Sequence, residues 1–196
     1  VSVVGANSAN NSTNPHLTIG GLSEFSDFKK NTQTENLENY TILMIEKECV
    51  SMKVSDYIFS TIADLGVKDI FTVSGGAAMH LLDSVGTNPN LNHISTHHEQ
   101  AAAMAAEGNA RITGKPGAAL VTSGPGGTNT LTGVCGAWID SIPVIFLSGQ
   151  VTSNTLIEGT GLRQFGIQES DIVSIVKSVT KYAVTIKNPK HIKYHL

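Results

Sequence analysis

Cysteine, arginine and long apolar stretches are scarce in this chain of 196 residues. Its two cysteines, Cys49 and Cys135, are too few and too far apart for a disulfide framework, so a reducing compartment such as the cytoplasm is expected. No apolar run approaches the roughly 20 residues that a membrane-spanning helix needs. Arg111 and Arg163 are the only arginines and the formal net charge is -3, which excludes a basic surface for nucleic acid or an anionic membrane.

The first 51 residues differ in composition from the rest of the chain. They are rich in Asn, Ser and Thr, and their apolar residues follow no sustained period. They lack arginine and carry acids such as Glu24 and Asp27, so neither a secretory signal nor a mitochondrial transit segment is indicated. We therefore expect residues 1–51 to be a poorly ordered extension outside the domain, which would span residues 52–196.

From residue 52 onward, helical and strand-like patterns alternate. Val54, Ile58, Ile62 and Leu65 recur at helical spacing and stop at Gly66. Strands are expected near residues 70–73, 94, 118–121 and 144–147, with helices at 100–111 and 128–138. Continuous apolar strands that alternate with helices predict an α/β fold, in which a parallel sheet is covered by helices on both faces.

Three polar or glycine-rich segments follow the expected strands. Gly75 and Gly76 follow the first strand, Glu99 opens an alanine-rich helix after the second, and a Thr-Ser-Gly-Pro-Gly turn at 122–126 follows the third. Taken singly, each has a simpler reading, because acids often complement a helix dipole and glycines often make turns. Ligands of parallel sheets bind at the carboxyl ends of the strands, so the three together predict one site.

In order and spacing, these segments resemble the thiamine diphosphate enzymes of the acetolactate synthase type, specifically their N-terminal, pyrimidine-binding domain. Five motifs carry the resemblance: a Gly-Gly-Ala turn, a His-Glu-Gln helix start, a Thr-Ser-Gly-Pro-Gly turn, an Asp-Ser-Ile-Pro lead into a strand, and a Gln-Glu pair. The last two stand here at residues 140–143 and at Gln168 and Glu169. The resemblance covers residues 52–196.

The resemblance implies a thiamine diphosphate-dependent lyase or transferase, a decarboxylase or carboligase of 2-oxo acids. Glu99 matches the catalytic acid that hydrogen-bonds the aminopyrimidine ring and so activates the cofactor. By the same resemblance the cofactor is bordered by Gly75, Gly76, Pro125 and Asn129, and Gln168 points into the substrate pocket.

Part of the implied enzyme lies outside this chain. In the family, a Gly-Asp-Gly motif in a separate pyrophosphate-binding domain of another subunit holds the diphosphate and its Mg²⁺, and neither that motif nor a set of metal ligands occurs here. Binding of FAD stays undecided. We expect a domain truncated at its C-terminal end and inactive alone, and a full-length homodimer or homotetramer that acts on a small 2-oxo acid.

Two departures from the family pattern lie at the substrate end. Ser74 stands where the family has Pro, and Ile167 stands where it has Phe before the Gln-Glu pair. The resemblance therefore leaves the substrates open among pyruvate, 2-oxobutanoate and a keto sugar.

Two other classes of function compete with this interpretation. A nucleotide- or cofactor-binding module without catalysis would use the glycine turns alone, but the turn at Gly75 lacks the third glycine of a dinucleotide fingerprint. A catalytically dead paralogue kept for assembly would not need Glu99.

Overall fold

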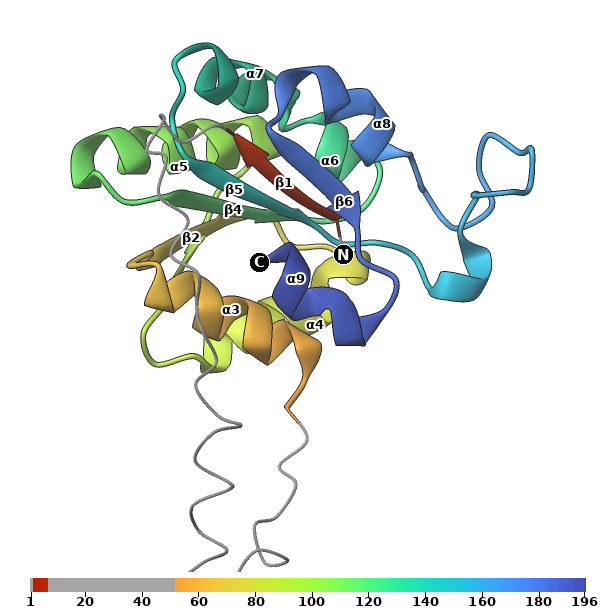
Figure 1. Ribbon diagram of the computed structural model, residues 1–196, viewed down its shortest axis with the longest axis horizontal. Helices are drawn as coiled ribbons and strands as arrows, with labels where there is room; N and C mark the ends of the chain where they lie inside the picture. The colour runs from red at the N-terminus through yellow and green to blue at the C-terminus, as the bar shows by residue number, and fades with distance from the viewer. Residues whose placement is uncertain (1, 7–51) are drawn as a thin grey trace, which may run out of the picture. The chain divides into compact units, whose positions relative to one another are not determined.

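Helices and strands alternate along the chain as the apolar pattern predicts (Figure 1). The computed structural model describes residues 2–6 and 52–196. The strands are β1 (Ser2–Ala6), β2 (Asp69–Thr72), β3 (Asn92–Ser95), β4 (Gly117–Val121), β5 (Val144–Ser148) and β6 (Tyr182–Thr185). The helices are α3 (Val54–Asp64), α4 (Met79–Thr87), α5 (Glu99–Thr113), α6 (Pro125–Thr128), α7 (Leu131–Ile139), α8 (Ile172–Val176) and α9 (Ile192–His195). Short 3-10 helices are η2 (Gly76–Ala78), η3 (Ser153–Thr155), η4 (Lys177–Val179) and η5 (Pro189–His191).

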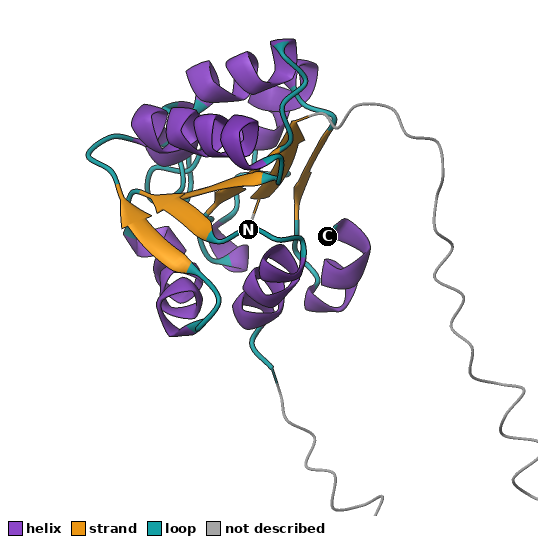
Figure 2. Ribbon diagram, turned by 90° about the vertical axis from the view of Figure 1, so that its left-hand side faces the viewer, coloured by secondary structure: helices purple, strands orange, loops and turns teal. Residues whose placement is uncertain are grey.

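The described strands form one sheet in the order β3-β2-β4-β5-β1-β6. Strand β2 pairs in parallel with β3 and β4, and β4 pairs in parallel with β5. Figure 1 shows α5, α7 and α8 over one face of the sheet and α3, α4 and α9 over the other, and Figure 2 shows the same layers from the side. The predicted α/β fold with a parallel sheet between helices is confirmed.

An apolar core fills the space between the sheet and each helical layer. On the side of α3 and α4 the fully buried side chains include Ile58, Phe59, Ile62 and Leu120. On the side of α5 and α7 they include Ala103, Ala106, Val134 and Ala137. Every residue of β4 is buried, so the turn that follows this strand extends from the most enclosed part of the sheet. Within the described residues, no helix is both long and apolar enough to cross a membrane.

The structure corrects one expectation about the N-terminal extension. Residues 2–6 do not stand outside the domain, because β1 lies in the sheet between β5 and β6 and runs antiparallel to both. Strands β5 and β6 do not pair with each other, and each would present unpaired backbone groups toward the other without a strand between them. A strand of five residues is too short to show a periodic apolar pattern. The expectation therefore rested on the composition of residues 1–51 as a whole, which did not reveal this strand. Residues 1 and 7–51 lie outside the described residues, and the expectation stands untested for them.

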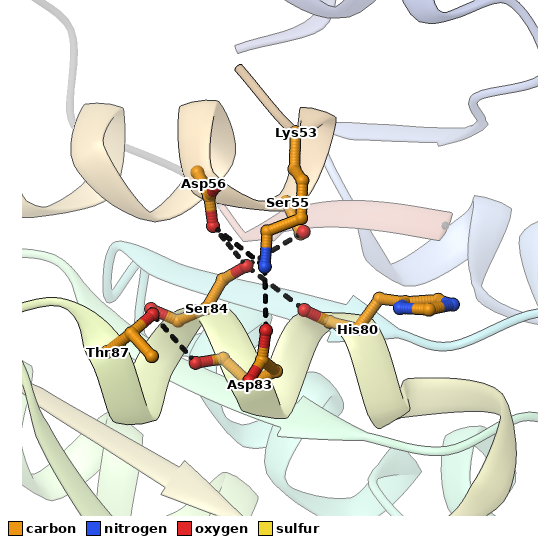
Figure 3. Close-up of polar contacts among 7 residues, drawn as sticks. All are labelled: Lys53, Ser55, Asp56, His80, Asp83, Ser84 and Thr87. Carbon is orange, nitrogen blue, oxygen red and sulfur yellow. Dashed lines mark hydrogen bonds and ion pairs between the residues drawn. The ribbon is translucent and has the colours of Figure 1, made fainter. Parts of the chain in front are cut away.

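An ion pair at the surface joins α3 to α4 (Figure 3). The Lys53 ammonium lies 2.6 Å from the Asp83 carboxylate and 3.4 Å from that of Asp56. The hydrogen bond between Lys53 and Asp83 raises the pKa of the lysine and lowers the pKa of the aspartate. The contribution of Asp83 is therefore present above its unfolded pKa and is lost as the pH falls. Because Lys53 and Asp83 are exposed, solvent weakens this pair.

A buried hydroxyl beneath that pair connects the same two helices. The Oγ of Ser84 lies 2.8 Å from the Oγ of Ser55 and 2.6 Å from an Asp56 carboxylate oxygen. It also lies 3.0 Å from the carbonyl oxygen of His80. Ser55 and Ser84 are both buried, so their polar atoms depend on one another instead of on water.

Replacement of Ser84 by Ala is expected to lower the free energy of unfolding by about 1–3 kcal/mol, because a buried hydroxyl and a carboxylate each lose a partner. Urea denaturation measures the difference. As a control, Ser178→Ala removes an exposed hydroxyl and should change stability by less than about 0.5 kcal/mol. Equal stability of the wild type and Ser84→Ala would contradict the role given to this hydroxyl.

Candidate functional site

The carboxyl ends of β2, β3 and β4 lie at one edge of the sheet, because the three strands are parallel neighbours. The turn at Gly75 follows β2, the N-terminus of α5 follows β3, and the turn at Gly124 follows β4. The edge is tied together by backbone hydrogen bonds from Val73 N–H to the Leu120 carbonyl and from Thr96 N–H to the Thr72 carbonyl. The structure thus brings the three predicted segments to one place.

Glu99 is the first residue of α5, and its side chain is half-buried. The side-chain amide of Asn129 donates a 2.9 Å hydrogen bond to Glu99 Oε2. In the part of the chain that the structure describes, the other carboxylate oxygen, Oε1, accepts no hydrogen bond. Two predicted site residues from different motifs therefore meet directly, and one oxygen of the acid remains available.

His98 caps the N-terminus of the helix that carries Glu99. Its backbone is extended, and its Nδ1 accepts a 3.1 Å hydrogen bond from the Gln100 N–H. A cap satisfies a backbone donor that has no partner inside the helix, so it fixes where the helix begins. The start of α5, and with it the position of Glu99, is set by this histidine.

The turn after β4 requires glycine at position 124. Gly124 has φ 58°, a left-handed conformation, and a Cβ placed on it would lie 1.7 Å from the Gln168 carbonyl oxygen. Pro125 follows as the first residue of α6, where a proline needs no N–H partner, and it is exposed. The predicted strand, glycine turn and helix start are all present.

The two glycines after β2 have different surroundings. A Cβ on Gly75 would lie 2.4 Å from the Thr122 side chain, so this glycine is needed where the first and third turns touch. A Cβ on Gly76 would meet no atom within 4 Å. Gly76 therefore leaves an uncovered stretch of backbone at the edge, whereas Gly75 is explained by packing inside the fold.

Gln168 lies beside the same glycine-rich turn. Its Cβ is 3.3 Å from the position of a Cβ on Gly124, and its side chain is exposed. Its φ of 54° is unusual for a residue other than glycine. The neighbouring Glu169 is buried and accepts hydrogen bonds from the Ile157 N–H with both carboxylate oxygens, a contact that the motif alone did not predict.

The alanine-rich face of α5 packs against other parts of the fold. A Cβ on Gly117 of β4 would lie 2.0 Å from the Ala106 carbonyl oxygen, and one on Gly133 of α7 would lie 2.5 Å from the Ala103 Cβ. Such short approaches are possible only between small residues. The alanines therefore let α5 sit close to the sheet, which positions Glu99 at its edge.

No metal centre is found among residues 2–6 and 52–196, since no group of three or more His, Cys, Asp or Glu side chains is placed to hold an ion.

An open, largely parallel sheet with a carboxylate, a helix N-terminus and two glycine turns at its carboxyl edge defines the class of α/β cofactor-binding domains. Residues 52–185 match the family described as "Thiamine pyrophosphate enzyme, N-terminal TPP binding domain". The chain belongs to this family, and the resemblance drawn from its motifs is confirmed.

Large subunits of acetolactate synthase are among its relatives. The chain is 40% identical over 138 residues to the isozyme 3 large subunit of Escherichia coli K12, covering 70% of this chain and 23% of that protein. It is 42% identical over 141 residues to a probable large subunit of Methanocaldococcus jannaschii, covering 72% and 23%. It is 35% identical over 154 residues to the chloroplastic acetolactate synthase 1 of Nicotiana tabacum, covering 79% and 22%. The chain thus spans less than a quarter of these curated relatives.

Proposed function

We propose that this chain is the pyrimidine-binding part of a thiamine diphosphate-dependent lyase or transferase that decarboxylates a 2-oxo acid and joins the product to a second carbonyl compound. The observation that supports it most is Glu99, half-buried at the start of α5 and held by Asn129, within a domain of the thiamine diphosphate family.

The residues at the edge fit this cofactor. Glu99 keeps Oε1 free for a hydrogen bond to a heteroaromatic ring, because Asn129 engages only Oε2. Gly76 offers uncovered backbone beside it, and Pro125 offers an exposed apolar ring. A flat ring with polar edges matches this combination of a directed carboxylate and small or apolar neighbours.

Thiamine diphosphate, when bound, supplies a nucleophilic ring carbon and an electron sink for loss of carbon dioxide. Glu99 would hydrogen-bond the aminopyrimidine ring and exchange a proton with it, as a general acid and base. Asn129 would fix the orientation of Glu99 while this proton moves. Gln168, beside the glycine-rich turn, would face the 2-oxo acid.

The complete site would lie between two subunits. The diphosphate and Mg²⁺ would be held by a pyrophosphate-binding domain of another subunit, in a cytoplasmic homodimer or homotetramer, and this chain alone would be inactive. Exposed apolar side chains on elements that lead to or from this end of the sheet support such an interface, among them Met79 of α4, Ile94 of β3 and Met104 of α5. Experiment decides which of pyruvate, 2-oxobutanoate and a keto sugar serve as donor and acceptor, and whether FAD is bound.

Removal of the cofactor tests this proposal. The enzyme that carries this chain, assayed with the 2-oxo acid that it consumes, should lose nearly all activity after dialysis against EDTA, because the reacting carbon belongs to the cofactor. Thiamine diphosphate and Mg²⁺ added together should restore it, and Mg²⁺ alone should not. Full activity in a preparation shown to be free of thiamine diphosphate would refute the proposal.

A further inference from the structure

Glu169 is a buried carboxylate that the proposed chemistry does not use. Only 7% of the residue is exposed, and in the part of the chain that the structure describes no Lys, Arg or His pairs with it. Its two oxygens lie 3.0 and 2.9 Å from the Ile157 N–H. Burial of a carboxylate costs free energy unless hydrogen bonds compensate. Glu169 therefore needs the Ile157 N–H as a donor, and an apolar residue at this position could not accept that hydrogen bond.

The contact closes a surface segment, residues 158–168, onto the body of the domain. Most residues of this segment are exposed, including the apolar side chains of Leu162 and Ile167, the latter 83% exposed. Two residues inside it contact the rest of the domain. Glu158 forms an ion pair with Lys187. A Cβ on Gly166 would lie 2.7 Å from the Val151 side chain, and the Gly166 carbonyl accepts a 3.3 Å hydrogen bond from the Glu169 N–H. Glu169 therefore joins both ends of the segment.

Gln168 directly precedes Glu169 in the chain. It has φ 54°, and its carbonyl oxygen would lie 1.7 Å from a Cβ placed on Gly124 of the glycine-rich turn. A residue other than glycine keeps this unfavourable conformation where the surrounding structure holds it. Here the neighbours of Gln168 are the glycine-rich turn at Gly124 and the hydrogen-bonded Glu169.

We propose that Glu169 is a positioning residue for the substrate side of the site: by accepting a hydrogen bond from the Ile157 N–H, it holds residues 158–168 closed and so keeps Gln168 beside Gly124. The part of this inference that concerns substrate rests on the proposed function, whereas the part that concerns the closed segment rests on the contacts alone.

Hydrogen exchange in the assembled enzyme tests the closed segment. Glu169→Ala should speed exchange of the Ile157 amide by about tenfold or more, because the charged acceptor is lost. Glu169→Gln keeps one acceptor oxygen and should stay within about threefold of the wild type. Gln164→Ala, an exposed change in the same segment, should have no effect. An unchanged exchange rate in Glu169→Ala would overturn the proposal.

Steady-state kinetics in the same variants test the link to substrate. Glu169→Ala should raise the KM for the 2-oxo acid by about tenfold and change the affinity for thiamine diphosphate by less than about threefold, with Glu169→Gln close to the wild type. Faster exchange with an unchanged KM would overturn the positioning role. An enzyme that binds no thiamine diphosphate in any variant would instead refute the proposed function, while the exchange rates would still decide whether the segment is anchored.

Discussion

Replacement of Glu99 by Gln is expected to lower kcat by about 100-fold or more while leaving the fold intact. The amide can still accept the hydrogen bond from Asn129, so the geometry at the start of α5 should be kept. It cannot take up or release a proton at Oε1, and general acid and base catalysis at this position is lost. Turnover of the 2-oxo acid at saturating thiamine diphosphate measures the effect, with circular dichroism to confirm the fold.

Glu107→Gln is the matched control for that variant. Glu107 lies on the same helix, eight residues further along, and its carboxylate, only 15% exposed, pairs with Arg111 at 2.6 Å. It is about two helical turns away from Glu99, so its replacement should leave kcat within about threefold of the wild type. Near-normal turnover in Glu99→Gln, or an equal loss in both variants, would contradict the assignment of Glu99 as the general acid and base.

Replacement of Gly124 by Ala should lower the free energy of unfolding by about 3 kcal/mol or more, the largest stability effect that we expect. Two causes act together, since φ 58° disfavours a Cβ and that Cβ would lie 1.7 Å from the Gln168 carbonyl oxygen. Relief would require movement of the glycine-rich turn or of Gln168, so substrate turnover should fall as well. Urea denaturation measures the loss of stability.

Gly108→Ala is expected to change the free energy of unfolding in the opposite direction. Gly108 lies inside α5, and a Cβ on it would meet no atom within 4 Å. Alanine is favoured over glycine in such a helix, so stability should rise by about 0.5–1 kcal/mol. If the two glycine variants changed stability alike, the close approach of Gly124 to Gln168 would not be the cause.

The parallel sheet and the position of the site could be predicted because both depend on local patterns. The apolar run of β4 is continuous since the strand is buried along its whole length, and a glycine turn follows it directly. Parallel strands bring their carboxyl ends together, so Gly76, Glu99 and Pro125 could be placed at one edge before any contact was known.

Contacts between residues distant in sequence could not be predicted in the same way. The bond from Asn129 to Glu99 joins residues 30 apart, and that from Ile157 to Glu169 closes a surface loop. Neither hydrogen bond produces a periodic pattern in the sequence, because one hydrogen bond constrains only the two residues that it joins. Strand β1 could not be predicted for a related reason. Its place between β5 and β6 depends on the backbone groups that those two strands leave unpaired, and its own composition does not show it.

The central claim is that Glu99 activates bound thiamine diphosphate, and the exchange of the cofactor's thiazolium ring proton with deuterium tests it most directly. Proton NMR of acid-quenched samples gives this rate without any substrate turnover. We expect exchange in the wild-type enzyme and in Glu107→Gln to be about 100-fold or more faster than in Glu99→Gln, with the cofactor saturating in all three. Equal exchange rates in the wild type and Glu99→Gln would contradict the claim.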